Sequence, residues 1–264
     1  MRILFASLAL LTLSACGLSP MYAGGGSGAI AQSLAGIEVA PIEGRAGWLV
    51  RSALEERLGL PPVELLTIGS AIELDQFKTM PEEDREYDLV LLGRMHMLKG
   101  VLDLPDVWAR VREQRPEARL VVIGEGPHRA DVQRIFAERG MSNSVTFTGG
   151  IGEEEKNELL AKSRVGLSLS SEEGWGLAVN EYLACALPVV AYDLPVFDEI
   201  FPSLLDSVPL GDSSAASQAI LELLDDPKAR QQQGQIGYNY VQRYDYRAMA
   251  REELNHLRAI CGLY

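Results

Sequence analysis

Cysteine and histidine are scarce in this sequence, with three of each among 264 residues. The cysteines, Cys16, Cys185 and Cys261, lie far apart and form no CxxC pair, and no histidine belongs to a His/Cys cluster. Such spacing favours neither a zinc site nor a disulfide framework. No Asp-x-Asp pair follows a predicted strand, so the sequence predicts no metal site. Cys185 lies in an apolar segment and is expected to be a small packed side chain.

Basic residues are also few: the chain has 24 Lys and Arg against 37 Asp and Glu, and its net charge is −13. An acidic chain is repelled by nucleic acid and by anionic lipid, so neither is expected as a general partner. Apolar residues make up 47% of the chain and charged residues 23%, which is typical of a folded globular protein. The length allows one or two domains.

The apolar run at the start, Ile3 to Leu13, is too short to span a bilayer. With Arg2 before it, this run is typical of a secretory signal peptide. It ends in Leu13-Ser14-Ala15-Cys16, which resembles a bacterial lipobox. We therefore expect residues 1–16 to be a signal peptide with lipid attached at Cys16. The alternative is a disordered apolar start.

Residues 17–60 are expected to form a leader and an incomplete domain. The first part is rich in Gly, Ser and Ala, which predicts a flexible chain. Ile37–Ile42 alternates as a strand does, and Gly47–Leu58 carries apolar residues on one helical face. With the segment Ala15–Tyr22, this strand and helix resemble the start of the outer-membrane lipoproteins of lipopolysaccharide assembly. Leu60-Pro61-Pro62 then predicts a domain boundary.

From Tyr87 onward the chain alternates strands and helices. The predicted strands are Asp88–Leu92, Arg119–Ile123, Val145–Phe147, Val165–Leu169 and Val189–Tyr192, with Ser207–Leu210 as a candidate last strand. The predicted helices are Val101–Gln114, Arg129–Arg139, Glu153–Ser163, Leu177–Ala186, Gln218–Leu224, Pro227–Tyr240 and Tyr246–Ile260. Such alternation builds a parallel sheet with helices on both faces, and ligands bind at the carboxyl ends of its strands. We therefore predict an α/β, Rossmann-like domain.

The stretch from Glu173 to Glu181 carries the clearest chemistry. It follows an apolar strand, and Gly174 and Gly176 permit a tight turn and close approach of a ligand to the backbone. The helix expected after the turn offers free N–H groups to a phosphate. A carboxylate inside the helix suits a sugar diol, and one on the turn suits hydroxyls or developing positive charge at the far end of the ligand. The alternative is two solvated glutamates beside an ordinary turn.

A basic loop, Gly93–Gly100, follows the first predicted strand. Arg94 and Lys99 are separated by four residues across a turn closed by glycine. Both are expected to converge on a diphosphate at the carboxyl end of the strand, the arginine as a fork and the lysine as a point charge. A solvated basic loop is the alternative.

Two further features can be explained either by contact with a ligand or by local structure alone. Gly124 and Gly126 follow the second strand and permit backbone to approach a ligand, although a strand-to-helix turn also needs glycine. Trp175 is expected either to stack on a ligand or to pack the turn.

Several motifs resemble those of the retaining, nucleotide-sugar-dependent glycosyltransferases of family 4, which have the GT-B fold. Glu173 and Glu181 resemble the family's E-x7-E pair, and Ala184-Cys185-Ala186-Leu187-Pro188-Val189-Val190 resembles its A-C-G-L-P-V-V. Gly93-Arg94 with Lys99-Gly100 resembles GR-x4-KG, and Gly124-Glu125-Gly126-Pro127 resembles VGDGP. The resemblance covers residues 65–264, with its motifs in the family's order.

The resemblance implies a role for each residue. Glu181 is implied to bind the ribose hydroxyls, and Glu173 to contact the donor sugar and support its departure. The implied diphosphate contacts are Arg94, Lys99 and the N–H groups near Gly176 and Leu177. Further donor-sugar contacts are implied at Gly174 and Trp175, and nucleotide contacts at Gly93, Gly124, Gly126, Gly149 and Ile151. Departures from the family pattern are Trp175 for Phe, Gly150 for an aromatic residue, Ala186 for Gly and Leu194-Pro195-Val196 for Gly-Gly-Ile.

By the same resemblance, residues 61–264 are expected to be a single GT-B donor-binding domain. The enzyme would transfer a hexosyl group from a nucleotide-diphospho-sugar with retention, without a metal ion or other cofactor. Residues 17–60 are too short to supply the acceptor-binding half, so turnover by this chain alone is not expected. The acceptor, a glycan or a lipid-linked sugar, would be bound by that missing domain.

The two ends of the chain predict different locations. A lipobox indicates a membrane-anchored protein outside the cytosol, whereas nucleotide-sugars are cytosolic. The alternative function is therefore a lipid-anchored envelope protein of lipopolysaccharide assembly, whose α/β domain binds or scaffolds without catalysis. Convergence of Glu173, Glu181, Arg94 and Lys99 on one cleft would favour the donor-binding function.

Overall fold

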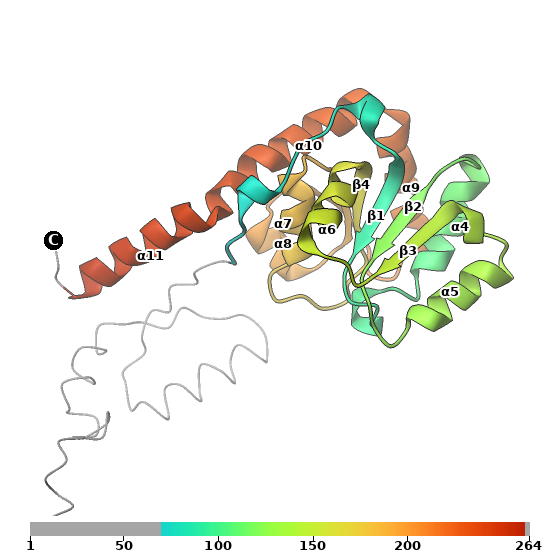
Figure 1. Cartoon of the computed structure of the whole chain (residues 1–264), viewed down its shortest axis with the longest axis horizontal. Coiled ribbons are helices and arrows are strands. Elements are labelled where there is room, and N and C mark those ends of the chain that lie inside the picture. The colour runs from blue at the N-terminus through green and yellow to red at the C-terminus, as the bar shows by residue number, and fades with distance from the viewer. Residues whose placement is uncertain (1–69, 262–264) are drawn as a thin grey trace, which may run out of the picture. The chain divides into compact units, whose positions relative to one another are not determined.

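The computed structural model describes residues 70–261, and the unit that contains the sheet spans residues 69–252 (Figure 1). The expected signal peptide at 1–16 with its Cys16, the leader at 17–60 and the predicted boundary after it lie outside the described residues. Within the described range, no helix combines the length and the apolar character needed to cross a bilayer.

Six parallel strands form one sheet in the order β3-β2-β1-β4-β5-β6. The strands are β1 (Tyr87–Leu92), β2 (Leu120–Ile123), β3 (Val145–Gly149), β4 (Ser163–Ser168), β5 (Val189–Tyr192) and β6 (Leu205–Val208). The predicted α/β fold with a parallel sheet is confirmed. The strand order reverses between β1 and β4, because β2 and β3 extend the sheet on one side and β5 and β6 on the other.

The helices alternate with the strands along the chain (Figure 1). The α-helices are α4 (Leu104–Gln114), α5 (Arg129–Glu138), α6 (Glu153–Ala161), α7 (Leu177–Ala184), α8 (Pro195–Ile200), α9 (Ser213–Asp225), α10 (Pro227–Val241) and α11 (Tyr246–Cys261). Short 3-10 helices are η3 (Leu74–Gln76), η4 (Glu82–Asp84), η5 (Met97–Lys99), η6 (Ser142–Ser144) and η7 (Gln242–Tyr244).

Helices cover both faces of the sheet, which is why the central strands are apolar almost throughout. Successive residues of β1 point to opposite faces: Leu89 and Leu91 join one buried cluster and Val90 the other. The first cluster includes side chains of α4, α5 and α9, and the second includes side chains of α6, α7, α8 and α10. The sheet is therefore the middle layer of three, as predicted.

Some elements differ from their predicted bounds. α4 begins at Leu104 rather than Val101, because Gly100 takes a left-handed conformation with φ 61°. β6 is Leu205–Val208 rather than Ser207–Leu210, since Pro209 has no N–H to continue the ladder.

The region after β5 holds more helix than the sequence predicts. α8 begins at Pro195, within the segment that departs from the family's Gly-Gly-Ile, and proline suits the first turn of a helix. α9 begins at Ser213 rather than Gln218, because the Asp212 side chain caps it by accepting from the Ala215 N–H at 2.9 Å.

α7 ends at Ala184 rather than at the predicted Ala186. Ala186 has a φ of 55°, a left-handed conformation that glycine adopts more readily. Its carbonyl oxygen packs under Gly234 of α10, where a Cβ would lie 2.1 Å from it. Helix packing therefore holds Ala186 in a strained conformation, at the position where the family motif has glycine.

Replacement of Ala186 by glycine is expected to raise the free energy of unfolding by about 0.5–1 kcal/mol. A left-handed conformation costs an alanine about 1–2 kcal/mol, and the larger entropy of glycine in the unfolded chain offsets part of that gain. Urea unfolding of the two proteins measures the difference. The control is Ala137→Gly at an exposed position of α5, expected to lower the same free energy by up to about 1 kcal/mol. Equal destabilisation by both would contradict strain at Ala186.

Candidate functional site

The connections after β1 and β4 lead to α4 and α7 on opposite faces of the sheet, and a tyrosine from α7 bonds to both strands where the strand order reverses. The hydroxyl of Tyr182 donates to the Leu167 carbonyl of β4 at 3.1 Å and accepts from the Leu92 N–H of β1 at 2.6 Å. A Cβ at Gly166 would lie 2.6 Å from the tyrosine ring, so this glycine makes room for it. Complete burial raises the pKa of Tyr182 far above its usual range, so the hydroxyl keeps its proton and donates.

A cavity of about 410 Å³ opens at this edge of the sheet, a volume within the range of small-molecule sites. Its walls come from the ends of β1 and β4, the loops that follow them, α6 and the start of α7. Its charged lining residues are Lys99, Lys156, Glu173 and Glu181. Two lysines and two glutamates thus meet at the place where sheets of this topology bind ligands.

Glu173 and Lys99, both predicted site residues, line the cavity and form an ion pair with each other. Glu173 lies between β4 and α7, and its carboxylate also accepts a hydrogen bond from Ser170 Oγ at 2.8 Å. The loop that carries Lys99 is held against the β4 loop, because the Leu98 carbonyl accepts from the Ser171 N–H at 3.0 Å. The structure therefore brings an acid from one loop and a base from the other together.

Glu181 lies in the middle of α7 and lines the same cavity. Its side chain is 19% exposed and accepts a hydrogen bond from Lys156 Nζ at 2.8 Å. Burial raises the pKa of Glu181, and the bond from Lys156 opposes that rise. Burial also acts to lower the pKa of Lys156, but its bonds to Glu153 and Glu181 outweigh burial and raise the pKa. Lys156 is therefore held positive beside Glu181.

Lys156 is a cavity residue that the sequence patterns do not single out. It follows three glutamates at the start of α6, which favours a solvated helix face. One signal does point to it: Leu159 and Leu160 are three and four residues further along, so Lys156 shares the inward face of the helix. A lysine on such a face needs a buried partner.

Arg94 does not join the other predicted residues. Its side chain is exposed, does not line the cavity, and forms no ion pair with any residue in the range 70–261. Gly93, next to it, does line the cavity. The predicted convergence of four charged residues therefore holds for Glu173, Glu181 and Lys99, and it is wrong for Arg94 in this structure because the side chain leaves the loop toward solvent.

α7 begins directly at the cavity. Gly176 precedes it with φ 94°, and a Cβ there would lie 2.8 Å from the Phe197 ring. Packing alone therefore requires this glycine, although the sequence assigns it to ligand approach. Leu177 and Ala178 line the cavity, and the first turn of a helix leaves N–H groups without intrahelical partners.

Trp175 packs the turn, one of its two predicted roles. Its ring meets the Tyr244 ring edge to face, with centroids 5.3 Å apart, and it also lines the cavity. The indole N–H is buried and has no hydrogen-bond partner among the described residues. Stacking of Trp175 on a ligand, and a ligand contact at Gly174, stay predictions.

The glycines after β2 are required by loop packing. A Cβ at Gly124 would lie 2.0 Å from the Gly93 carbonyl oxygen, and one at Gly126 would lie 2.4 Å from the Met95 carbonyl oxygen. Neither glycine lines the cavity. A strand-to-helix turn that needs glycine therefore accounts for both residues, and a nucleotide contact at either one stays a prediction.

The loop after β3 also lies outside the cavity lining. Gly149 has φ 74°, and a Cβ there would lie 2.3 Å from the Glu125 carboxylate. Ile151 is half-buried against the second hydrophobic cluster. Contact of Gly149 and Ile151 with a base likewise stays a prediction.

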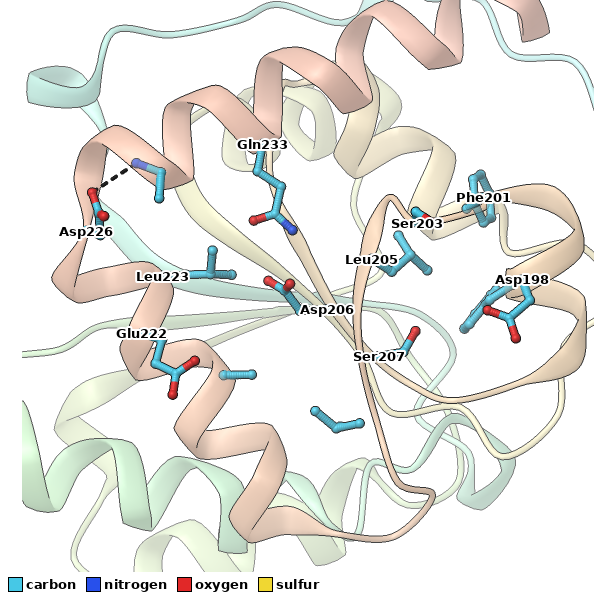
Figure 2. Close-up of a pocket in the computed structure, with 14 residues that line it drawn as sticks. Asp198, Phe201, Ser203, Leu205, Asp206, Ser207, Glu222, Leu223, Asp226 and Gln233 are labelled. Atoms are coloured by element: carbon cyan, nitrogen blue, oxygen red, sulfur yellow. Dashed lines mark hydrogen bonds between the residues drawn. The ribbon is translucent and has the colours of Figure 1, made fainter.

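A larger hollow of about 710 Å³ lies along β6 at one edge of the sheet (Figure 2). Figure 2 shows Asp206 of β6 facing Gln233 of α10. Burial raises the pKa of Asp206, and nearby Glu222 adds to that rise. Every charged residue in the lining of this hollow is a carboxylate, and none is Lys, Arg or His. An anionic ligand would be repelled, so the cavity between β1 and β4 is the better candidate.

Comparison with known proteins gives one family match. A family model described as "Glycosyl transferases group 1" matches residues 73–240, which include the two strand-end loops that line the cavity, after β1 and β4. The match ends before α11 and begins after the expected leader.

Individual relatives agree with that match. Alpha-D-kanosaminyltransferase of Streptomyces kanamyceticus is 25% identical over 184 residues, 64% of this chain and 48% of the relative. A phosphatidyl-myo-inositol mannosyltransferase of Propionibacterium freudenreichii is 29% identical over 181 residues, 64% of this chain and 44% of the relative. The chain therefore spans under half the length of these curated relatives.

Among solved structures, the C-terminal domain of a glycosyl transferase group 1 family protein from Francisella tularensis is similar in fold. The TM-score is 0.59 at 20% identity, and the match covers 66% of this chain and 99% of that domain. At such identity the likeness concerns the fold alone, and it agrees with a single α/β domain.

Replacement of Tyr182 by phenylalanine is expected to lower the free energy of unfolding by about 1–3 kcal/mol, because Leu92 N–H and the Leu167 carbonyl would be buried without a partner. Urea unfolding measures the loss. The matched control is Tyr238→Phe in α10, whose hydroxyl makes no hydrogen bond within the described chain and whose loss is expected to be close to zero. Equal stability of Tyr182→Phe and wild type would contradict the bridging role.

Proposed function

This chain belongs to the glycosyl transferases of group 1, whose model matches well over half of its 264 residues, and we propose on that basis that its α/β domain binds the nucleotide-diphospho-sugar donor of a sugar-transfer reaction. The observation that carries the proposal is the pairing of two lysines with two glutamates in one cavity at the reversal of strand order. Acid groups there suit the hydroxyls of a sugar and a ribose, and basic groups suit a diphosphate between them.

The donor would lie across the cavity with its ribose at α7. Glu181, which is half-way along that helix, would accept hydrogen bonds from the ribose hydroxyls. Lys99 and the first N–H groups of α7, at Leu177 and Ala178, would hold the diphosphate. Glu173 would face the donor sugar. This orientation agrees with the roles implied by the E-x7-E resemblance.

Transfer would proceed with retention and without a metal ion. As the bond to the sugar breaks, negative charge grows on the departing diphosphate and positive charge on the sugar. Lys99 and the start of α7 would stabilise the negative charge on the diphosphate, and Glu173 would stabilise the positive charge on the sugar. Because Lys99 is paired with Glu173 in the structure, an incoming diphosphate would compete with the glutamate for the lysine.

The acceptor would be a glycan or a lipid-linked sugar bound by a second domain. One relative is named for transfer of a kanosaminyl group and another for transfer of mannose to phosphatidyl-myo-inositol. Because this chain spans under half of each, we propose for it the donor-binding half of such a protein, within residues 61–264.

The alternative, a lipid-anchored envelope protein with a non-catalytic domain, has no support from the family match. Three of the four charged residues that would favour donor binding converge on one cavity. Lipid attachment at Cys16, a location outside the cytosol and the relation to lipopolysaccharide-assembly lipoproteins stay predictions. We propose that the donor-binding domain works where nucleotide-sugars are, on the cytosolic side.

Calorimetric titration of the full chain with UDP, GDP and ADP tests the donor site. Binding of one of them is expected to weaken about 10- to 100-fold in Glu181→Ala, since hydrogen bonds to a charged group contribute about 1.5–3 kcal/mol. The matched control is Glu154→Ala on the exposed face of α6, which is expected to bind as wild type does. A folded wild-type chain that binds none of the three nucleotides would refute the proposed function.

Arg94→Ala tests whether the exposed arginine reaches the diphosphate from the rim. Binding is expected to weaken at low ionic strength, and the difference from wild type is expected to shrink as salt is added, because exposed charges are screened. Titration at two salt concentrations measures both. An unchanged affinity at low salt would leave Lys99 and the α7 N–H groups as the phosphate contacts and would exclude Arg94.

A further inference from the structure

We propose that Lys156 is a positioning residue, which fixes the Glu181 carboxylate through one oxygen and leaves the other oxygen free to receive the ribose diol of a nucleotide. The inference rests on the proposed function, because it assumes that a ribose reaches Glu181. It concerns a contact between α6 and α7, which the E-x7-E motif does not contain.

The geometry of the ion pair leaves room for a ligand. Lys156 Nζ donates to Glu181 Oε1 at 2.8 Å. Among the described residues, no other group donates a hydrogen bond to this carboxylate, and its Oε2 accepts none. A carboxylate has about four acceptor positions, and one is used. Because both side chains line the cavity, the remaining positions are available to two hydroxyls.

Lys156 is itself held in place. Its side chain is only 10% exposed, and its ammonium also binds Glu153, one helical turn earlier in α6. The next residue, Asn157, donates from its side-chain amide to the Gln76 carbonyl at 3.2 Å, which ties α6 to η3. An ammonium fixed between two carboxylates on two helices restricts the rotamer of Glu181.

The positive charge of Lys156 has a second effect, which is to favour the ionised form of Glu181. Burial and the negative charge of Glu153 both raise the pKa of Glu181, whereas Lys156 acts to lower it. Without the lysine, Glu181 would be partly buried with no positive partner beside it, and its pKa would be expected to rise further. A protonated carboxyl group donates from one oxygen, so it accepts a diol less well than a carboxylate does.

The other charged groups around the cavity do not replace Lys156. Lys99 is engaged by Glu173, and Tyr182, beside Glu181 in α7, is neutral because burial raises its pKa. The charged and titratable groups near Glu181 are Glu153 and Lys156 of α6, Lys99, Glu173, Tyr182 and Cys185.

The test compares a nucleoside diphosphate with its 2′-deoxy form, using whichever of UDP, GDP and ADP the full chain binds. Wild type is expected to prefer the ribose form by about tenfold or more. In Lys156→Met, the ratio of the affinities for the ribose form and the 2′-deoxy form is expected to fall toward one. The loss is expected to grow as the pH falls, because a carboxyl group with a raised pKa gains its proton as the pH falls.

Three controls separate positioning from a purely structural role. Lys156→Arg keeps the charge and is expected to restore the preference for ribose. Lys162→Met, at the end of the same helix and outside the cavity lining, is expected to bind as wild type does. Lys156→Met combined with Glu181→Gln is expected to bind no more weakly than Glu181→Gln alone. Additive losses, or a pH-independent loss that arginine does not restore, would overturn the inference.

A direct titration of Glu181 tests the role of Lys156 without a ligand. In the ligand-free protein, the Glu181 carboxyl carbon observed by NMR is expected to titrate at higher pH in Lys156→Met than in wild type. If that variant does not fold, Lys156→Gln serves in its place. Nucleotide binding that is indifferent to Lys156 overturns this inference alone. Absence of nucleotide binding by wild type overturns the proposed function and, with it, this inference.

Discussion

The Tyr182 hydroxyl, bonded to β1 and to β4, is the contact on which the site depends. A parallel sheet that reverses its strand order must keep its two central strands paired while the chain leaves them toward helices on opposite faces. Tyr182 satisfies the Leu92 N–H at the end of β1 and the Leu167 carbonyl near the end of β4. Since it is one residue after Glu181, the same helical turn that fixes the strands also aims a carboxylate into the cavity.

Charge balance is the second constraint. The cavity pairs two lysines with two glutamates, so it is close to neutral before a ligand enters. The diphosphate of the proposed donor would add negative charge, and the positive groups left to meet it would be the helix start of α7 and the exposed Arg94. Lys99 can contribute only by leaving Glu173. If the proposed donor binds, rearrangement of the Lys99–Glu173 pair would accompany it, and Glu173 would then be free to meet the sugar.

The sequence predicts this fold well because its strands are short apolar runs separated by helical patterns, and parallel strands bring the residues that follow them to one edge. That rule brings Glu173, Glu181 and Lys99 together correctly. It fails for Arg94, whose side-chain direction depends on the conformation of the loop after Gly93. The helical face of Lys156 can be inferred from Leu159 and Leu160, but the contacts of Lys156 with Glu181 and of Tyr182 with Leu92 are not predictable from local patterns, since these partners lie 25 and 90 residues away. The bounds of α4, α7 and β6 differ where Gly100, Ala186 and Pro209 act on the backbone.

The glycines of the motif blocks show that a family pattern mixes two kinds of constraint. Gly124, Gly126 and Gly176 each lie where a Cβ would strike Gly93, Met95 or Phe197, so packing explains them without a ligand. A partly buried carboxylate paired with a lysine has no such explanation: desolvation makes it costly, and apolar side chains would fill the same space at lower cost. The acid–lysine pairs are therefore the stronger evidence for a binding site. Because Lys156 belongs to one of them and lies outside the motif, the structure adds to the site a residue that the pattern alone does not contain.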